Sequence, residues 1–359
     1  MTKITESSET DLRKEKLNGL GGKKVKRKKI INVMFVLVLL FTVVMAAGCG
    51  KNKDGIKRLK LSINTNQSQV DMAEAMQERI KELSGGKMEI DVYGDGQLGG
   101  DREVAETVQY GNIDMCIVST TPVAAFYPDL NVFDAPFLFK DSAQAQEILD
   151  GEIGQEIAEG MEDIGFKVLG FPENGFRQLS TASKEVHSPS DLKGLKVRVM
   201  ESEVHIETWK ALGASPTPMA FSELFTALQQ KTVDGQDNPF VTDRDNRFYE
   251  VQDYIIETNH VYTPYLLLMS KDSYDKLTEE EKEIIEEAGA YGVSVQRKKT
   301  AEYDEDAVQE MQDKGVTLIS LTDEEKQQFR DAVSDIYSLV ETKVEHPELF
   351  QRILDETAE

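Results

Sequence analysis

Apolar and polar positions early in the chain change period several times, and each change predicts an element. Residues 59–63 and 88–93 alternate between the two kinds, as half-buried strands do. Residues 70–83 instead have the spacing of an amphipathic helix. A helix at about 102–110 and a strand at 113–118 follow. This alternation of strands and helices predicts an α/β domain with a largely parallel sheet.

Two capping boxes mark the starts of helices near the C-terminus. Thr278 and Glu281 form the first box, before a helical pattern that runs to about residue 313. Gly289–Gly292 is a place where this pattern could break, and a second box begins at Thr322. The spacing between these regions predicts further helices at 142–161 and 222–230 and strands at 166–170, 194–199 and 260–269.

The N-terminal segment has the parts of an export signal. A basic block at 23–29 precedes the apolar residues 30–47, and small residues stand directly before Cys49. This ending resembles the lipobox of bacterial lipoproteins, in which the cysteine is lipidated, so residues 1–48 are expected to be a signal peptide and 49–55 a tether. The alternative is a transmembrane anchor, because eighteen apolar residues almost span a bilayer. Either arrangement tethers residues 50–359 to a membrane, outside the cytoplasm.

The charge of the remaining chain limits its partners. The 359 residues include 41 Lys and Arg and 65 Asp and Glu. Ten of the basic and four of the acidic residues lie in 1–48, so residues 49–359 have a net charge of about −30. Such a surface repels nucleic acid. It still permits a small anionic ligand, because a desolvated arginine pair can outweigh a screened surface field.

Patterns for enzyme chemistry and for cofactors are weak. The chain has neither H-E-x-x-H nor G-x-S-x-G, and its four histidines are not spaced as metal ligands, so no metal, no cofactor and no enzymatic activity are expected. Residues 94–99 fit G-x-G-x-x-G, but they follow the second strand and open a short crossover. Glycines at a sharp turn beside a cleft are the favoured interpretation. Cys116 lies in an apolar run and is expected to be a buried thiol, and nothing supports a disulfide with Cys49.

Arg198 is the most unusual residue of the second half, because it interrupts the apolar strand at 194–199. A charge in such a strand is costly unless it meets an opposite charge. The partner could be Glu201 or Glu203, which follow directly, or an anionic ligand. Composition alone does not choose between them.

Several motifs in one order resemble a known family. They are Asn174-Gly-Phe-Arg177, Gly194-Leu-Lys-Val-Arg198 and the block from Met219 through Asp234-Gly-Gln-Asp-Asn-Pro239. The set closely resembles the extracytoplasmic solute receptors of tripartite ATP-independent periplasmic (TRAP) transporters. Gln97-Leu-Gly99, Gly111-Asn-Ile-Asp114, Pro136-Phe-Leu-Phe139 and His260-Val-Tyr262 fit the same pattern, so the resemblance covers nearly all of residues 57–350.

The resemblance implies a receptor for a small organic acid, a C4-dicarboxylate or a sugar acid, which it hands to a membrane permease. Arg198 would form a bidentate salt bridge to the ligand carboxylate, because a planar guanidinium matches its two oxygens. Arg177 and Asn238 would contact the same group. Phe221 would pack on the ligand, and Asn64 and Ser119 would line the opposite wall.

The resemblance also implies a class II periplasmic-binding clamshell of two discontinuous α/β domains with a bridging long helix. The expected domains are 56–175 with 264–303 and 176–263 with 304–359. Three positions depart from the family pattern: Lys231 replaces a glycine, Asp237 a commoner glutamate, and Ser119 an acid found in some relatives. A sensor that serves a receptor kinase, or an exported hydrolase, remains an alternative, and the particular acid stays open.

Overall fold

The computed structural model describes residues 55–64 and 66–358. The expected signal peptide, Cys49 and most of the tether lie outside these residues. Residues 56–359 form one unit by their contacts, and the account below concerns that unit alone. Among its described residues, no helix has the length and apolar character needed to cross a membrane.

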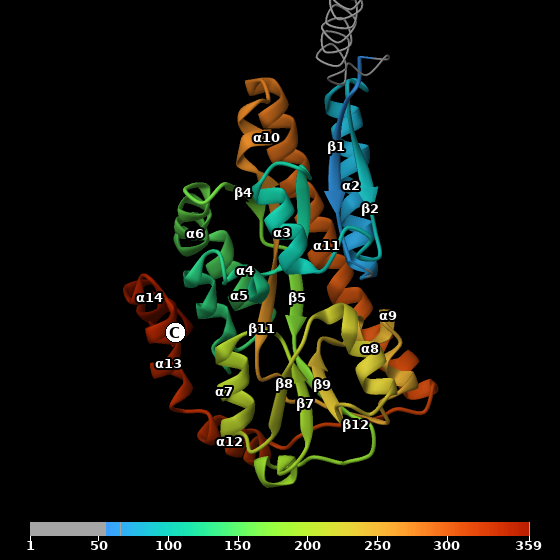
Figure 1. Ribbon diagram of the computed structural model, residues 1–359, viewed down its shortest axis with the longest axis vertical. Coiled ribbons are helices and arrows are strands. Elements are labelled where there is room, and N and C mark those ends of the chain that lie inside the picture. The colour runs from blue at the N-terminus through green and yellow to red at the C-terminus, as the bar shows by residue number, and fades with distance from the viewer. Residues whose placement is uncertain (1–54, 65, 359) are drawn as a thin grey trace, which may run out of the picture. The chain divides into compact units, whose positions relative to one another are not determined.

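The first sheet has the strand order β2-β1-β3-β11-β4, and β5 pairs with one end of β11 (Figure 1). The strands β1 and β2 are parallel, as are β1 and β3, whereas β11 runs antiparallel to β3, β4 and β5. The expected largely parallel sheet is therefore mixed, because β11 joins its middle from much later in the chain. The bounds are β1 Lys57–Ser62, β2 Met88–Tyr93, β3 Met115–Ser119, β4 Phe166–Gly170, β5 Glu173–Phe176 and β11 Tyr262–Ser270.

The second sheet has the order β12-β10-β6-β9-β7-β8. The strand β7 is parallel to both β8 and β9, and β6 is antiparallel to β9 and β10. The bounds are β6 Gln178–Thr181, β7 Lys196–Val199, β8 Ser215–Pro218, β9 Gly235–Asn238, β10 Tyr254–Ile256 and β12 Thr317–Ile319.

Helices surround both sheets. The predicted helix at 142–161 is two helices, because Gly151 is extended (φ −89°, ψ −160°) and ends α5 while it starts α6. The α-helices are α2 Gln67–Leu83, α3 Asp101–Gln109, α4 Thr120–Val123, α5 Ser142–Asp150, α6 Glu152–Glu162, α7 Glu203–Ala211, α8 Phe221–Gln229, α9 Phe240–Asp245, α10 Lys271–Asp275, α11 Glu279–Asp313, α12 Asp323–Ala332, α13 Ile336–Lys343 and α14 Pro347–Thr357. Three 3₁₀ helices are η1 Pro128–Asp134, η2 Pro189–Leu192 and η3 Phe248–Glu250.

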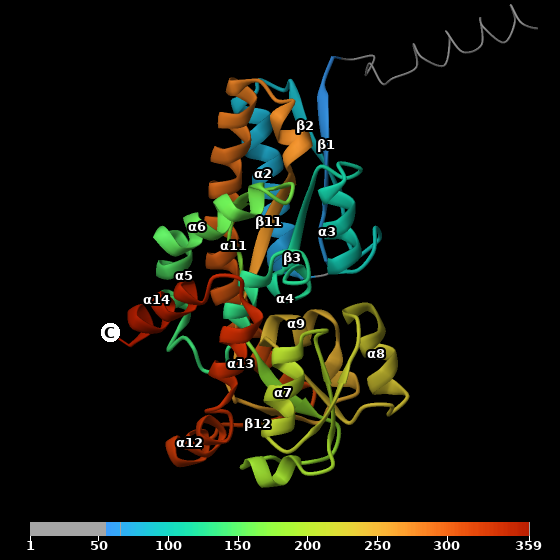
Figure 2. The same cartoon turned by 60° about the vertical axis from the view of Figure 1, so that its left-hand side comes forward.

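The long helix α11 runs from beside the first sheet to the second (Figure 2). Its first half places Ile285 and Ala288 in the apolar core of the first sheet, and its last turns place Ala307 and Met311 beside β10 and β12. Both predicted capping boxes are present, at Thr278 and at Thr322. The bridging helix is therefore confirmed.

The break considered at Gly289–Gly292 does not occur, because both glycines lie where α11 is closely packed. A Cβ on Gly292 would lie 2.6 Å from Cγ of Met76 on α2, and one on Gly289 would lie 3.3 Å from Cβ of Leu169. The missing side chains allow α2 and β4 to approach the helix backbone, and the helical hydrogen bonds continue through both positions.

The chain passes between the two sheets at β5–β6, at β10–β11 and along α11. Arg177 lies at the first crossing, and its backbone N–H donates to the carbonyl of Val261 at the second crossing (2.8 Å). The two crossing strands are thus tied side by side, and they carry polar residues into the region between the lobes.

Candidate functional site

A polar pocket lies between the two lobes, with about 430 Å³ of space not filled by atoms, its open mouth included. All six residues expected to bind the ligand line this pocket: Asn64, Ser119, Arg177, Arg198, Phe221 and Asn238. They come from distant parts of the chain, and the fold brings them together. The pocket is also lined by Asn66, Asp101, Asn174, Met200, Thr242, Asn246 and Tyr265.

Arg198 is buried on β7, with 3% of its surface exposed. Its Nε and Nη2 both donate to the carbonyl of Met219, at 3.1 and 2.8 Å. Neither glutamate considered as a partner pairs with it: Glu201 is exposed, and Glu203 instead meets Lys343 (2.5 Å). Among the described residues no carboxylate lies within ion-pair distance of Arg198.

The environment of Arg198 is unfavourable for a positive charge. Burial lowers the pKa of Arg198 to about 10, and the nearby charge of Arg177 acts in the same direction, against Asp237, Asp101 and Glu201. The guanidinium is still protonated at neutral pH, so the second lobe presents a buried cation to the pocket. A bound anion would relieve this cost.

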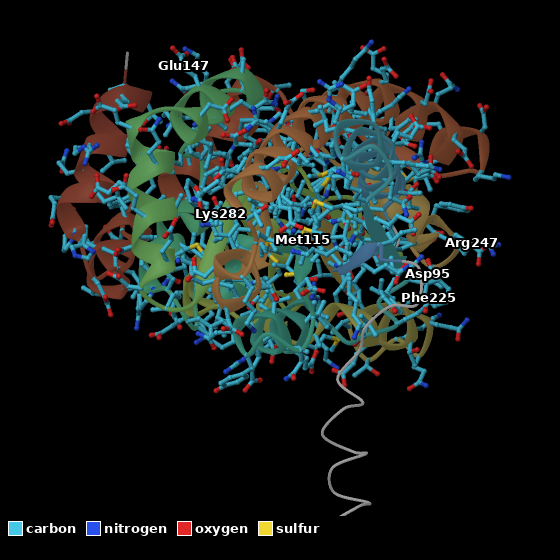
Figure 3. The ribbon with its side chains drawn as sticks, turned by 90° about the horizontal axis from the view of Figure 1, so that it is seen from above. Asp95, Met115, Glu147, Phe225, Arg247 and Lys282 are labelled. Carbon is cyan, nitrogen blue, oxygen red and sulfur yellow. The ribbon has the colours of Figure 1, made fainter. Side chains whose placement is uncertain are left out.

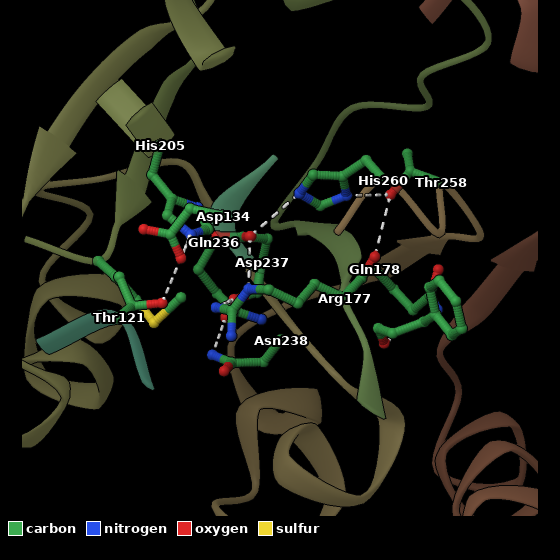
Figure 4. Close-up of polar contacts among 12 residues, drawn as sticks. Thr121, Asp134, Arg177, Gln178, His205, Gln236, Asp237, Asn238, Thr258 and His260 are labelled. Carbon is green, nitrogen blue, oxygen red and sulfur yellow. Dashed lines mark hydrogen bonds and ion pairs between the residues drawn. The ribbon is translucent and has the colours of Figure 1, made fainter. Parts of the chain in front are cut away.

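Arg177 differs from Arg198 in that its charge is already paired with a carboxylate (Figure 4). Its Nε lies 2.7 Å from Oδ2 of Asp237, and its Nη2 also donates to the Asp237 carbonyl. His260 Nε2 lies 3.1 Å from the same Oδ2, and His260 Nδ1 lies 2.8 Å from the hydroxyl of Thr258. Three linked residues, Asp237, His260 and Thr258, therefore hold the Arg177 guanidinium in the pocket wall.

The pKa values of Asp237 and His260 fit a state in which the Asp237 carboxylate is paired. Burial raises the pKa of Asp237, but the charge of Arg177 and the hydrogen bond from His260 outweigh it and hold the pKa well below its ordinary value. Burial lowers the pKa of His260 despite the neighbouring Asp237. The imidazole is therefore neutral at pH 7, with its Nε2–H donated to the carboxylate and its Nδ1 accepting from Thr258.

Asn238 ends β9 beside these groups, and its side chain is held in place. Its Nδ2 donates to Oε1 of Gln236, whose Nε2 donates to Oδ1 of Asp243 (2.8 Å) and to Ser180 (2.7 Å). Burial raises the pKa of Asp243 well above its ordinary value. Through this buried network the sheet fixes the orientation of the Asn238 amide toward the pocket.

Phe221 begins α8 and lies beside Arg198. The guanidinium carbon of Arg198 is 6.0 Å from the centre of the Phe221 ring, which meets Phe248 edge-on at 6.0 Å. A half-buried ring next to the cation makes an apolar wall against which the carbon chain of a ligand can pack.

On the first lobe, Asp101 joins the two expected residues Asn64 and Ser119. Its Oδ1 accepts from Asn64 Nδ2 (2.6 Å), and its Oδ2 accepts from the backbone N–H of Ser119 (3.0 Å). Burial raises the pKa of Asp101, although both hydrogen bonds and the charge of Arg198 act in the opposite direction. Asp101 was not among the predicted residues. The sequence feature that could have indicated it is its position in the first turn of a helix, directly after the glycine turn. Ligands of α/β proteins bind at this end of the strands.

The lobes also touch directly across the pocket. Asn66 Nδ2 lies 3.3 Å from the hydroxyl of Thr242, and the backbone N–H of Gln67 donates to Asp245 (2.7 Å). Thr242 in turn contacts Asn174 (3.3 Å). These contacts join the start of α2 in one lobe to α9 in the other, so the cleft is closed here.

A second hollow continues from the pocket toward the glycine turn at 94–99. It shares Asn64, Asp101, Phe221 and Asn246 with the pocket. Asp95 lines it from the first lobe and Phe225 from the second, and in the view from above both lie toward the same side of the molecule (Figure 3). The turn has left-handed backbone at residues 95, 96 and 99 (φ 55°, 61° and 123°), as a sharp turn beside a cleft requires.

Neither metal ligation nor cysteine chemistry has a visible site in the described part of the chain. No group of three or more His, Cys, Asp or Glu side chains there could hold an ion. Cys116 is a buried free thiol in β3, as expected, and burial raises its pKa well above the ordinary value.

Two α/β lobes linked by crossing strands and a bridging helix, with a polar cleft between them, define a class II periplasmic-binding clamshell. The chain belongs to the bacterial extracellular solute-binding proteins of family 7, whose sequence model matches residues 61–343. It is 40% identical over 266 residues to a solute-binding protein of Verminephrobacter eiseniae. The aligned residues cover 74% of this chain and 79% of that protein.

Two solved structures show the same fold. The sugar acid binding protein of Advenella mimigardefordensis in complex with galactonate has a TM-score of 0.82 and 35% identity, covering 84% of this chain and 99% of that one. A TRAP periplasmic solute binding protein of Shewanella oneidensis with bound succinate has a TM-score of 0.80 and 30% identity, covering 84% and 99%. The resemblance found in the motifs is thus confirmed across the fold.

Proposed function

We propose that this chain is the receptor of a TRAP transporter, which captures a small organic acid through Arg198 and delivers it to a membrane permease. The observation that carries the proposal is the buried guanidinium of Arg198, which faces the pocket without a carboxylate partner among the described residues. A ligand carboxylate would supply the missing charge with two parallel hydrogen bonds. Sugar-acid and succinate complexes of proteins with this fold support the ligand class.

The mechanism is binding with hinge closure and without a reaction. We place the lobes at 56–175 with 264–303 and at 176–263 with 304–359, so that Arg198 and Asn238 come from one lobe and Asn64 and Ser119 from the other. A ligand that contacts both walls stabilises the closed state, because those contacts exist together only when the cleft is shut.

We further propose that Cys49 carries lipid and holds the receptor at the outer face of the cytoplasmic membrane. Its support is the sequence alone: a basic block, an apolar segment and small residues directly before the cysteine. Labelled fatty acid should be incorporated into the wild-type protein and not into the Cys49→Ser variant, and a wild-type protein without label would favour a transmembrane anchor.

A thermal-shift screen against organic acids tests the binding function. The four buried apolar clusters of the described residues all lie within residues 56–358, so a protein that begins at residue 50 keeps them. A ligand present at about a thousand times its Kd adds about 4 kcal/mol of stability. Uptake of the acid by cells with and without this chain, in the presence of the two membrane subunits, tests delivery.

Variants of Arg198 connect the screen to the site. Arg198→Ala should weaken binding of the acid at least about 100-fold, because two charge-assisted hydrogen bonds are lost. Arg198→Lys should give an intermediate loss, since an ammonium group lacks the fork geometry. Arg352→Ala, an exposed arginine paired with Glu156, serves as the control. Unchanged affinity in Arg198→Ala would refute the assignment.

A further inference from the structure

We infer that the ligand is a polyhydroxylated monocarboxylate of the aldonate or uronate kind, and that Asp101 excludes a second carboxylate. Relatives with this fold hold galactonate in one case and succinate in another, so the fold does not decide between a sugar acid and a dicarboxylate. The inference rests on the proposed function, because it takes Arg198 as the partner of the ligand carboxylate.

The arginines of the pocket can neutralise one negative charge of a ligand. Arg177 and Arg198 are the arginines of the lining, but the charge of Arg177 is neutralised by Asp237 at 2.7 Å. One positive charge is therefore left for the ligand. A single carboxylate balances it, and a second would have no cation of its own among the lining residues.

On the opposite wall, Asp101 and Asn64 present side-chain oxygens that can accept hydrogen bonds from a ligand. Each oxygen of Asp101 already accepts one hydrogen bond, from Asn64 and from the Ser119 N–H, and an ionised carboxylate can only accept. Because Asn64 donates its Nδ2 to Asp101, its Oδ1 is also an acceptor, and no described residue donates to it. These oxygens need hydrogen-bond donors, which hydroxyl groups supply and a carboxylate or an alkyl chain does not.

The rest of the lining suits hydroxyl groups as well. Besides Asn64, four asparagines and one threonine line the pocket, and amides and hydroxyls can pair with a group that both donates and accepts. They are Asn66, Asn174, Asn238, Asn246 and Thr242.

Asp101 would also repel a distal carboxylate directly. Asp101 lines the pocket from α3 in the first lobe and Arg198 from β7 in the second, so a ligand that bridges the two walls places its far end on the Asp101 side. Two carboxylates in a buried site cannot both keep their charge without a large cost.

Calorimetric titration with matched acids tests the inference. Gluconate and glucarate have the same carbon chain and inner hydroxyls, and they differ in whether the far end is a hydroxymethyl group or a carboxylate. Erythronate and meso-tartrate form the four-carbon pair, and succinate is a diacid without hydroxyls. The monoacid of at least one pair should bind at least about 50-fold more tightly than its diacid and than succinate.

Asp101→Asn removes the charge at almost constant size. It should shift the ratio of diacid to monoacid affinity at least about tenfold toward the diacid, while Glu106→Gln, an exposed acid on the same helix, should leave the ratio unchanged. An unchanged ratio in Asp101→Asn would overturn the role of Asp101. If that variant does not fold, the wild-type pairs still decide the ligand class.

The failure of this inference is distinguishable from failure of the proposed function. Tighter binding of succinate or of either diacid in the wild-type protein would overturn the inference and leave the receptor for organic acids standing. If no acid of the thermal-shift screen binds, both fail. Binding of a monoacid that Arg198→Ala does not weaken would overturn the salt bridge on which the inference rests.

Discussion

Arg177 and Asp237 form a fully buried ion pair, with Nε 2.7 Å from Oδ2 and side chains 1% and 0% exposed. The pair lies where the chain crosses between the sheets, and His260 completes it from the second crossing. The charge of Arg177 is therefore paired within the pocket wall, whereas Arg198 has no carboxylate within ion-pair distance among the described residues.

Arg177→Ala should lower the free energy of unfolding by about 3–5 kcal/mol, because it leaves the Asp237 carboxylate buried without a partner. Arg198→Ala should cost far less, since it strands no carboxylate among the described residues. Urea unfolding of both variants measures the contrast. Replacing Arg177 and Asp237 together with leucine should recover much of the loss. Wild-type stability in Arg177→Ala, with weaker acid binding, would instead give Arg177 a direct role in holding the ligand.

The buried His260 should make the protein less stable as the pH falls from 7.5 to 5. Burial lowers its pKa in the folded state, whereas the unfolded chain takes up a proton near the ordinary pKa of about 6.5. The unfolded state then binds more protons, so the free energy of unfolding decreases below that pH, by up to about 1.4 kcal/mol per pH unit. His260→Asn should reduce this slope, as measured by urea unfolding at several pH values.

His346 provides a control of opposite sign. Its hydrogen bond to Asp129 raises its pKa, so the folded state takes up the proton first and gains stability as the pH falls. His346→Asn should therefore make the loss at acid pH steeper. An equal slope in the wild type and in His260→Asn would show that His260 is not the group responsible.

Much of the site was predictable because the family motifs carry it, whereas the unpredicted residues depend on packing between distant segments. Arg198 and Asn238 lie in quoted motifs, and both line the pocket. Asp101 gave a weak local signal, since its importance comes from Asn64 and Ser119 on two other segments.

The errors in the fold have the same origin. Local spacing predicts strands well, as for residues 88–93, but it does not show that β11 enters the first sheet antiparallel to its neighbours. Nor does it show that Gly289–Gly292 is packed against α2 and β4, which keeps α11 continuous. Contacts with distant segments of the chain determine both the direction of β11 and the continuity of α11.

Lys231→Gly should stabilise the protein by about 1 kcal/mol. Lys231 follows the end of α8 with left-handed backbone (φ 57°), and the next N–H, of Thr232, donates back to Ala227 (2.9 Å). This is a Schellman ending, in which glycine avoids the strain that a Cβ causes. The midpoint of thermal unfolding should rise while affinity for the acid stays the same, because exposed Lys231 is not part of the pocket lining. A drop in stability would mean that its side chain makes a compensating contact.

Gly292→Ala should destabilise the protein by about 1–3 kcal/mol, against the usual gain of about 1 kcal/mol for this change within a helix. The new Cβ would lie 2.6 Å from Cγ of Met76 and 3.2 Å from Cγ of Met72, and both side chains are fully buried. Because Cγ is near the backbone, the methionines cannot clear the space without moving α2 away from α11. Ser294→Ala, an exposed change two residues later, should be neutral or slightly stabilising. If Gly292→Ala were as stable as the wild type, the close approach of α2 to α11 would not be what requires glycine there.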